Sequence, residues 1–511
     1  MDVEGIAYLV GAGPGDPELI TLKGLHCIKK SDVIIYDWLA SDELLSYARS
    51  DAELIFVGKM GTKHLLEQDR INALIVEKVK QNKIVTRLSG DPFIFGRGGE
   101  EAEALKAANL DFEIVPGVTD AVAVPAYAGI PVTHRRLASS FAVVSGREDV
   151  NKTNLSSINW KNLATAVDTL VFLMGVDNIS QIAKQLIDSG RPAATPVALI
   201  RNGTSQTQET LVGTLQNISK QAQDYNFHPP AIIVVGEVVR LRDQIQWFDN
   251  RPLFGKRVLI TRSRQQAGDL RKVLIQYGAD VIEMPTINIE PLSDYSELDQ
   301  AINDLHRYGW VVLTSVNGAQ IFFERLSSQG FDSRELRGVG ICAIGPATAK
   351  IVSNMGITPD FVPPKYTAVD IVAGISRYDI QGIEFLLPRA EIASQDLVDG
   401  LIRLGAKVHQ ISTYRTLAVG PTESRGRKTI LDGGVDIITF TSSSTVKGLV
   451  SIMGDQLEAI NNCTIACIGP VTADTAIGLG IRVDIVAEEH TMEGLVRAIR
   501  DTELAKISQG T

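Results

Sequence analysis

Glycine, proline and aspartate gather in a loop near the start of the chain, where they limit what a ligand site could bind. The loop reads "VGAGPGDPELI" over residues 10–20 and continues an apolar run. Gly11 and Gly13 occupy the first and third positions of a dinucleotide-binding fingerprint, but the sixth position holds Asp16, which would repel a pyrophosphate. Pro14 also removes a backbone N–H donor. We therefore expect the glycines to admit a ligand close to bare backbone and not to bind phosphate.

A second loop of the same kind follows another apolar run. Residues 87–105, "RLSGDPFIFGRGGEEAEAL", again contain Gly-Asp-Pro, then "GRGG" before a Glu-rich helix start. A tight strand-to-helix turn would explain either loop taken alone. The two together favour a pair of backbone-exposing turns that face one cleft.

The elements that position these loops follow one pattern along the chain. Short apolar runs such as "DVIIYD" and "WVVLTS" alternate with helical patterns, which predicts an α/β fold with parallel sheets built from β-α units. The 511 residues are too many for one core. A charged, proline-containing segment at residues 240–254 marks the best boundary, and each half is long enough for two lobes.

Composition excludes several classes of protein. The net charge of -10 argues against broad nucleic-acid binding. The acidic N-terminus is not a signal peptide, and the apolar stretches are too short to span a membrane. The few cysteines suggest neither disulfides nor a metal site, and Cys463 and Cys467 are expected in the core. We expect a soluble, cytoplasmic protein without bound metal.

The second half carries an internal repeat. "RVLITRSRQQAGDLRKVLIQYGADVIEMP" resembles "EFLLPRAEIASQDLVDGLIRLGAKVHQIS" at an offset of 127 residues, which carries Arg262 to Arg389. An offset of 124 carries Gly345 of "IGPATA" to Gly469 of "IGPVTA". The repeat predicts two similar α/β lobes with a ligand cleft between them.

The ordered motifs of the first half resemble the tetrapyrrole methylase family, specifically the uroporphyrinogen-III C-methyltransferases. Besides the two loops, they include "VIIYDWLAS", "VGKMGTKHLLEQDRIN", "VPGVTDAVAVPAYAGIPVTHRR", "TLVFLMGVDNI" and "VALIRNGTSQTQETLVGTL". The resemblance covers residues 1–248 and implies two α/β lobes, about 1–118 and 119–248, with S-adenosyl-L-methionine (SAM) between them. It implies that uroporphyrinogen III is methylated twice to give precorrin-2, a reaction governed by positioning.

The same resemblance assigns site residues by position. The residues expected to line the SAM pocket are Pro14, Gly90, Asp91, Ile94, Thr119, Asp120, Met174 and Gly203. Asp37 and Lys59 fall where the family has a proton acceptor and a proton donor, and a proton must leave after carbon methylation. The substrate carries eight carboxylates, so we expect guanidinium anchors from Arg87, Arg97, Arg135, Arg136 and Arg147.

The first half departs from the family pattern in four places. "RLSGDP" is one residue shorter than the usual "RLKGGDP" and lacks its lysine. Trp38 and Met60 stand where arginines are usual, and Asp120 stands where a small residue is usual. These departures bear on substrate affinity and on the degree of methylation.

The second half resembles the uroporphyrinogen-III synthases over residues 253–505, through "VLITR", "TSVNGAQ", "IGPATA", "TYRT" and "IGPVTA". The resemblance implies cyclisation of hydroxymethylbilane with inversion of ring D and without a cofactor. It also implies a crossed chain, with one lobe from 253–288 plus 412–505 and the other from 289–411. Tyr414 would assist departure of the hydroxyl group. The groups expected to hold substrate are Thr348, Ser443 and Thr472, although helix capping explains both threonines equally well.

Together the resemblances predict a bifunctional enzyme of tetrapyrrole biosynthesis whose synthase half supplies its methylase half. The expected ligands are SAM and the tetrapyrroles hydroxymethylbilane and uroporphyrinogen III, and a homodimer through the methylase half is implied. Two alternatives stay open: a methylase half that acts on a later corrin precursor, and a second half that is a non-catalytic, ligand-binding regulatory module. The sequence does not separate a sirohaem from a cobalamin destination.

Overall fold

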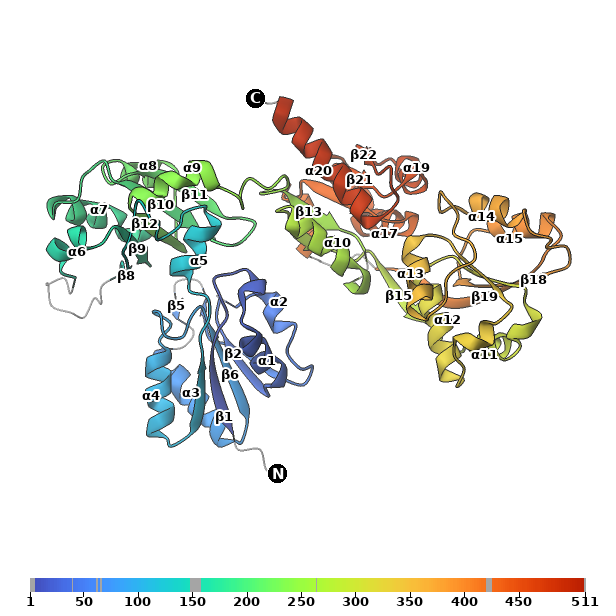
Figure 1. Ribbon diagram of the computed structural model, residues 1–511, viewed down its shortest axis with the longest axis horizontal. Helices are drawn as coiled ribbons and strands as arrows, with labels where there is room; N and C mark the ends of the chain where they lie inside the picture. Colours follow the sequence, from blue (N-terminus) through green and yellow to red (C-terminus); the bar gives the residue numbers. More distant parts are fainter. Residues whose placement is uncertain are drawn as a thin grey trace. The chain divides into compact units, whose positions relative to one another are not determined.

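The computed structural model describes residues 5–38, 40–60, 63–64, 67–147, 158–262, 264–419 and 425–509. The chain divides into two compact units, Met1–Gly255 (unit 1) and Lys256–Thr511 (unit 2). Each unit holds two five-stranded sheets with helices packed on their faces (Figure 1). We number these sheets I and II in unit 1 and III and IV in unit 2.

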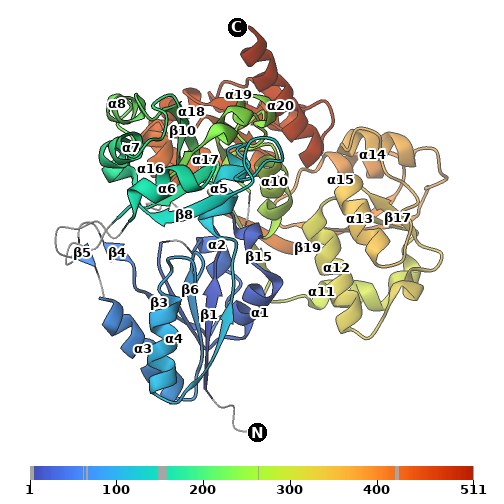
Figure 2. The same ribbon diagram turned by 60° about the vertical axis from the view of Figure 1, so that its left-hand side comes forward.

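Sheet I is entirely parallel, with strand order β3-β2-β6-β1-β7. Its strands are β1 (Ile6–Gly11), β2 (Val33–Tyr36), β3 (Glu53–Phe56), β6 (Ile84–Ser89) and β7 (Asp111–Val115). Apolar side chains seat α3 (Gln68–Lys80) and α4 (Gly98–Ala107) on one face, and α1 (Leu22–Lys30) and α2 (Asp42–Leu45) on the other (Figure 2). A two-stranded ribbon, β4 (Lys59–Met60) and β5 (Lys63–His64), follows β3.

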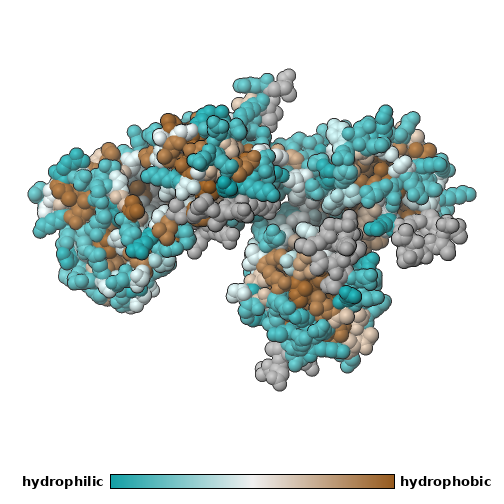
Figure 3. Space-filling view, turned by 180° about the vertical axis from the view of Figure 1, so that it is seen from behind, coloured by the Kyte–Doolittle hydropathy of each residue, from teal (hydrophilic) through white to brown (hydrophobic). Residues whose placement is uncertain are grey.

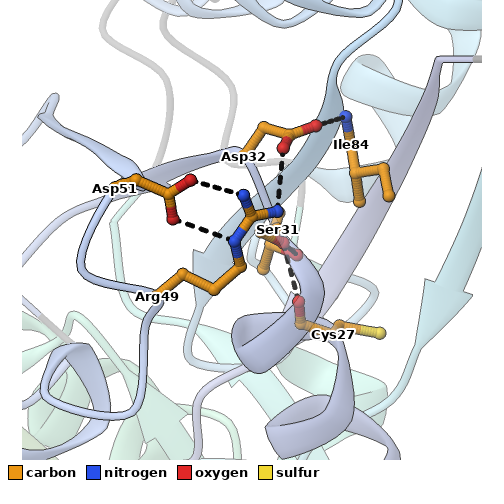
Figure 4. A network of polar contacts seen from close by, with 7 residues as sticks. Cys27, Ser31, Asp32, Arg49, Asp51 and Ile84 are labelled. Atoms are coloured by element: carbon orange, nitrogen blue, oxygen red, sulfur yellow. Dashed lines mark hydrogen bonds and ion pairs between the residues drawn. The ribbon is translucent and has the colours of Figure 1, made fainter.

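A polar network joins three strands of sheet I at the edge where they begin (Figure 4). Asp32 accepts a hydrogen bond from the backbone N–H of Ile84 at 2.9 Å and pairs with the Arg49 guanidinium at 3.0 Å. Arg49 also binds both carboxylate oxygens of Asp51, at 3.0 and 2.6 Å. The network fixes the starts of β2, β3 and β6, so their opposite, carboxyl ends are left to carry the loops.

Sheet II is mixed, with order β11-β10-β12-β9-β8. Its strands are β8 (Phe141–Ser145), β9 (Thr169–Leu173), β10 (Pro196–Arg201), β11 (Glu209–Thr214) and β12 (Ala231–Val235). Helices α6 (Trp160–Ala166), α7 (Ile179–Asp188) and α8 (Ile218–Asp224) cover one face and α5 (Asp120–Tyr127) the other, with α9 (Arg242–Ile245) ending the unit. The expectation of parallel sheets is wrong here. β10 runs antiparallel to β11 and to β12, and β12 runs antiparallel to β9. The connection from β10 to β11 is too short for the crossover that a parallel pair needs.

Sheet III of unit 2 is parallel, with order β14-β13-β20-β21-β22. Its strands are β13 (Arg257–Ile260), β14 (Asp280–Glu283), β20 (Ile437–Phe440), β21 (Thr464–Cys467) and β22 (Ile485–Val486). Its helices are α10 (Arg264–Gln276), α16 (Arg425–Leu431), α17 (Ser443–Met453), α18 (Glu458–Asn461), α19 (Pro470–Gly478) and α20 (Met492–Gln509). The chain leaves this sheet after β14 and returns to it only at β20.

Sheet IV is formed by the intervening chain, with order β15-β19-β18-β16-β17. Its strands are β15 (Ile287–Pro291), β16 (Trp310–Leu313), β17 (Gly340–Ala343), β18 (Glu384–Ala390) and β19 (Lys407–Ala418), and only β15 is antiparallel. The helices are α11 (Ser296–Asn303), α12 (Val316–Ser328), α13 (Pro346–Asn354), α14 (Ala368–Ile375) and α15 (Asp396–Arg403). Strands β18 and β13 are equivalent in the repeat, and the order β19-β18-β16-β17 matches β14-β13-β20-β21.

Each sheet has apolar side chains on both faces, which form the cores. Cys463 and Cys467 lie in the core beside sheet III, where burial raises the pKa of the Cys467 thiol to about 12. Hydrophilic side chains cover most of the surface seen from behind, with apolar ones in separate patches (Figure 3). Among the described helices, none has the length and apolar character needed to cross a membrane.

Candidate active sites

A cavity of about 630 Å³ in unit 1 collects the residues that the sequence singled out. It is lined by the loops after β1 and β6, by the start of α5 and by the ends of β9 and β10. All eight residues expected around SAM line it: Pro14, Gly90, Asp91, Ile94, Thr119, Asp120, Met174 and Gly203. Segments more than 200 residues apart in the sequence, from Pro14 to Ile232, therefore meet at one place.

Asp16 shapes the first loop and joins it to the rest of the cavity wall. One carboxylate oxygen accepts the backbone N–H of Glu18 at 2.9 Å, which caps the short 3-10 helix Pro17–Leu19. The other accepts the Tyr127 hydroxyl of α5 at 2.8 Å. The backbone N–H of Asp16 donates to Thr204 Oγ1 at 3.0 Å. The residue that argues against phosphate thus ties the loop to α5 and to the segment after β10.

Asp91 organises the second loop in the same manner. It accepts backbone N–H groups of Phe93 and Ile94 on one oxygen and of Gly117 on the other, all at 2.9 Å. A Cβ at Gly96 would overlap the carbonyl oxygen of Asp91, so the turn closes only with glycine there. Asp91 lines the cavity, but its carboxylate is engaged with backbone.

Three residues of the cavity lining adopt left-handed backbone conformations. Phe95, Met174 and Asn202 have φ of +59°, +57° and +49°, and all three line the cavity. Such conformations are costly outside glycine and concentrate at ligand sites. Sequence reasoning found Met174 by resemblance but missed Phe95 and Asn202, because no local motif marks a strained residue.

Asp120 brings an uncompensated carboxylate to the cavity. It is the first residue of α5, and its Oδ1 atom is buried without a hydrogen-bond partner in the part of the chain that the structure describes. Burial raises the pKa of Asp120 to about 6. Among the lining residues that the structure describes, two others carry carboxylates, Asp91 and Asp177, and one, Arg147, carries a guanidinium. The cavity therefore suits a cationic ligand.

Arg87 is not placed on the cavity wall, although it was expected to anchor substrate. It is 5% exposed and lies between two carboxylates, with Nη2 at 2.9 Å from Asp37 and Nε at 3.1 Å from Glu101. A third bond goes to the Leu88 carbonyl. Burial alone would lower the pKa of Arg87, but the two carboxylates outweigh it and raise the pKa, so the guanidinium remains charged. Arg87 thus holds Asp37 in place.

The other predicted cations are dispersed. Arg147 lines the cavity, while Arg97, Arg135 and Arg136 are exposed and lie outside its lining. Lys59 begins the short strand β4, and its side chain lies outside the described residues. Trp38, next to Asp37, lines the cavity with its ring edge-on to Phe56, at 5.0 Å between centroids.

Unit 2 has a smaller cavity of about 230 Å³ at the carboxyl edge of sheet IV. Tyr414 lines it and donates its hydroxyl to Ser315 Oγ at 3.1 Å. Ser315 is the N-cap of α12, where its hydroxyl oxygen accepts the Gly318 N–H at 3.0 Å. A hydroxyl chain therefore runs from Tyr414 to a helix N-terminus.

The other predicted synthase residues lie outside that cavity. Thr348 in α13 and Thr472 in α19 are buried at equivalent positions of the two repeats. Ser443 begins α17, and its hydroxyl lies 2.7 Å from that of Thr475. Of the described lining, sequence reasoning assigned a site role only to Tyr414. It missed the polar residues Ser315 and Arg389, although the repeat had already aligned Arg389 with Arg262.

Comparisons with known proteins give a separate family match in each of the two units. The family model "Tetrapyrrole (Corrin/Porphyrin) Methylases" matches residues 7–219, and "Uroporphyrinogen-III synthase HemD" matches residues 268–497. The porphyrin biosynthesis protein HemD of Ruminiclostridium josui is 38% identical over 494 residues, covering 96% of this chain and 97% of that protein. The uroporphyrinogen-III C-methyltransferase of Methanocaldococcus jannaschii is 51% identical over 245 residues, covering 47% of this chain and 98% of that protein.

A relative that covers almost the whole chain and the two family matches together assign each half of the chain to a family. The N-terminal match covers sheet I and the strands of sheet II other than β12, and the C-terminal match covers most of sheets III and IV. The chain belongs to the tetrapyrrole methylase family in its N-terminal half and to the uroporphyrinogen-III synthase family in its C-terminal half, fused in one polypeptide.

Proposed function

We propose that the chain converts hydroxymethylbilane to precorrin-2 in two consecutive reactions. Residues 253–505 cyclise hydroxymethylbilane to uroporphyrinogen III with inversion of ring D. Residues 1–248 then methylate that product twice with SAM. The observation that carries the proposal is the unit 1 cavity, whose lining includes every residue assigned to SAM from the sequence.

The residues around this cavity fit SAM in size, backbone exposure and charge. The glycine loops leave main chain open to a close approach by the ligand. SAM carries a sulfonium and an ammonium group, and the described lining includes three residues with carboxylates and one with a guanidinium. The unpartnered Oδ1 of Asp120 gives these cations a buried acceptor. When bound, SAM supplies an electrophilic methyl group.

The chain's own residues then hold the acceptor and remove a proton. Trp38 and Phe95 offer exposed aromatic surface in the cavity lining against which a flat tetrapyrrole ring can pack. Asp37 accepts the proton that leaves the methylated pyrrole carbon, and Arg87 holds one oxygen of Asp37 at 2.9 Å so that its carboxylate stays oriented.

Unit 2 acts through its hydroxyl chain. Without substrate the Tyr414 hydroxyl donates to Ser315 Oγ at 3.1 Å, which orients the phenol. With substrate bound, Tyr414 gives this proton to the departing hydroxyl group of hydroxymethylbilane, which leaves as water. The phenolate then takes up the proton that the pyrrole carbon loses when the ring closes. The protein's task is to hold the flexible linear chain in the folded arrangement that gives the type III isomer.

One incubation tests both steps. Hydroxymethylbilane and SAM are added to the full chain, and the products are separated by chromatography and weighed by mass spectrometry. We expect a dimethylated type III tetrapyrrole. A type I isomer would reject the synthase assignment, and an unmethylated type III product would reject the methylase assignment. Methylation of only a pre-formed corrin precursor would support the later-step alternative.

The family resemblance also supports a homodimer formed through residues 1–248. Sedimentation equilibrium of the full chain measures its mass directly. We expect twice the chain mass of 55.4 kDa, and a single-chain mass would reject the dimer.

A further inference from the structure

The unit 2 cavity lies where the strand order of sheet IV reverses. From β16 the chain moves to β17 on one side and later to β18 on the other. Several cavity residues lie at the carboxyl ends of these strands. They include Thr314 and Ser315 directly after β16, Ile344 directly after β17, and Arg389, the second-last residue of β18. In open α/β sheets such reversal points are where ligands bind, outside the carboxyl ends of the strands.

Arg389 is a buried cation without a counter-charge. It is 6% exposed, and its guanidinium donates to the Ser394 carbonyl at 2.7 Å and to Gln410 Oε1 at 3.5 Å. Within the described residues no carboxylate pairs with it, and its Nε has no hydrogen-bond partner. Arg87, equally buried, is balanced by two carboxylates. A buried cation left this way favours an anionic ligand.

The strand ladder is irregular beside this arginine. Arg389 pairs with Ser412 and Ala390 with Tyr414, so Thr413 is an extra residue, and its hydroxyl donates to the Arg389 carbonyl at 3.1 Å. Bulges of this kind occur next to active sites, where they re-aim side chains. Here the bulge brings Tyr414 one position nearer to Arg389.

The other repeat has a larger side chain at the position equivalent to Ala368. Arg262 is equivalent to Arg389, and Met492 is equivalent to Ala368, which lines the unit 2 cavity. Beside sheet III the Arg262 guanidinium lies 3.3 Å from Met492 Sδ. Both Ala368 and Met492 are the first residue of a helix that follows a threonine. The small side chain of Ala368 leaves space where the other repeat has a methionine.

We propose that Arg389 and Ser315 form a subsite beside Tyr414 that binds one carboxylate arm of the substrate, and that Ala368 keeps it open. The substrate identity rests on the proposed function of unit 2. The guanidinium supplies charge and paired N–H donors, and the hydroxyl groups at the start of α12 supply further donors. This arm is held next to Tyr414, so the subsite also orients the end of the chain that reacts.

The test uses the full chain and four variants. Arg389→Gln removes the positive charge, and Arg389→Lys keeps the charge but lacks the planar guanidinium. Ala368→Met introduces the methionine that the other repeat has at the equivalent position. Val369→Met is the matched control, because it adds the same side chain one residue along α14 at a position that is 73% exposed. Steady-state formation of the type III isomer is measured against hydroxymethylbilane concentration. Methylation of added uroporphyrinogen III monitors the integrity of unit 1.

We expect Arg389→Gln and Ala368→Met to raise KM about tenfold with little change in kcat, Arg389→Lys to lie between, and Val369→Met to match the wild type. Unchanged KM in both Arg389→Gln and Ala368→Met would overturn the subsite while leaving the synthase proposal intact.

Binding of propionate gives a readout that needs no turnover. In saturation-transfer NMR we expect a propionate signal with the wild type and Val369→Met that falls in Arg389→Gln and Ala368→Met. Displacement by phosphate at equal concentration would show a general anion site and overturn carboxylate selectivity. If propionate binds as expected but no type III isomer forms, the subsite stands and the proposed function falls.

Discussion

Asp120 links ligand binding to stability at a single carboxylate. Its pKa is raised to about 6 by burial, above the ordinary value of 3.8, so ionisation destabilises the folded chain as pH rises between these values. At neutral pH the folded protein therefore carries an unfavourable charge. A cationic ligand would compensate that charge, so binding of the ligand would stabilise the folded chain.

Replacement of Asp120 by asparagine separates the two effects. We expect Asp120→Asn to raise the free energy of unfolding by about 1 to 2 kcal/mol at pH 7, with the gain vanishing below about pH 4. We also expect SAM affinity to fall about tenfold at pH 7.5. Urea denaturation and isothermal titration calorimetry measure these changes. Asp111→Asn, at an exposed position that begins β7, serves as the control. Loss of stability in Asp120→Asn would contradict this account.

Replacement of Arg87 should lower the stability of the protein, because its partner Glu101 is buried. Arg87→Met leaves Glu101, which is 1% exposed, without its counter-charge and should destabilise unit 1 by about 3 to 5 kcal/mol. Adding Glu101→Gln should recover part of the loss, since it removes the stranded charge. Urea denaturation of the two single variants and the double variant measures the coupling. Unchanged stability with a raised KM for uroporphyrinogen III would instead support direct anchoring of substrate.

Individual residues were predictable from the sequence to an uneven degree. Motif order brought together all eight residues assigned to the unit 1 cavity, because strand-to-helix loops at one edge of a sheet converge. It did not separate Arg87, which pairs with Asp37 and Glu101, from Arg147, which lines the cavity. Those partners come from other segments of the chain, and side-chain pairing across a fold leaves no local signal.

At the scale of elements, two glycines that follow β6, Gly96 in the turn and Gly99 in α4, should respond differently to replacement by alanine. A Cβ at Gly96 would overlap backbone of Asp91, whereas a Cβ at Gly99 meets nothing within 4 Å. We expect Gly96→Ala to displace the turn and to weaken both SAM binding and methylation. Gly99→Ala, inside α4, should keep both and stabilise the helix by about 0.5 to 1 kcal/mol. SAM titration and the methylation assay compare the two variants. Equal behaviour would show that the turn tolerates a side chain.

The repeat extends further through the elements of unit 2 than the sequence comparison reached. Asp360 accepts the N–H of Ile341 at 2.7 Å, and Asp484 accepts that of Ile465 at 2.8 Å, at equivalent positions beside β17 and β21. The sequence predicted strands and helices by their apolar runs and matched segments of the two repeats. It did not predict the antiparallel pairs of sheet II, because periodicity reports an element and not its direction.

At the scale of the whole molecule, each unit has its own sheets and its own cores. We therefore expect fragments 1–255 and 256–511 to fold separately, each with a cooperative urea transition. The first should methylate supplied uroporphyrinogen III, and the second should form the type III isomer from hydroxymethylbilane. A fragment that is folded but inactive would show that its reaction depends on the other unit.

The crossed connection in unit 2 has a consequence during synthesis on the ribosome. Strand β13 pairs with β20, and the Thr439 hydroxyl reaches the Leu259 carbonyl across 180 residues of chain. At ordinary elongation rates that interval takes roughly 10 to 40 seconds. All strands of sheet IV are synthesised during this interval, so sheet IV can form before β20 exists. Until then, the edge of β13 that pairs with β20 has no partner strand. Newly made chains are thus open to chaperones or to misassociation at β13, and translation speed before β20 sets for how long.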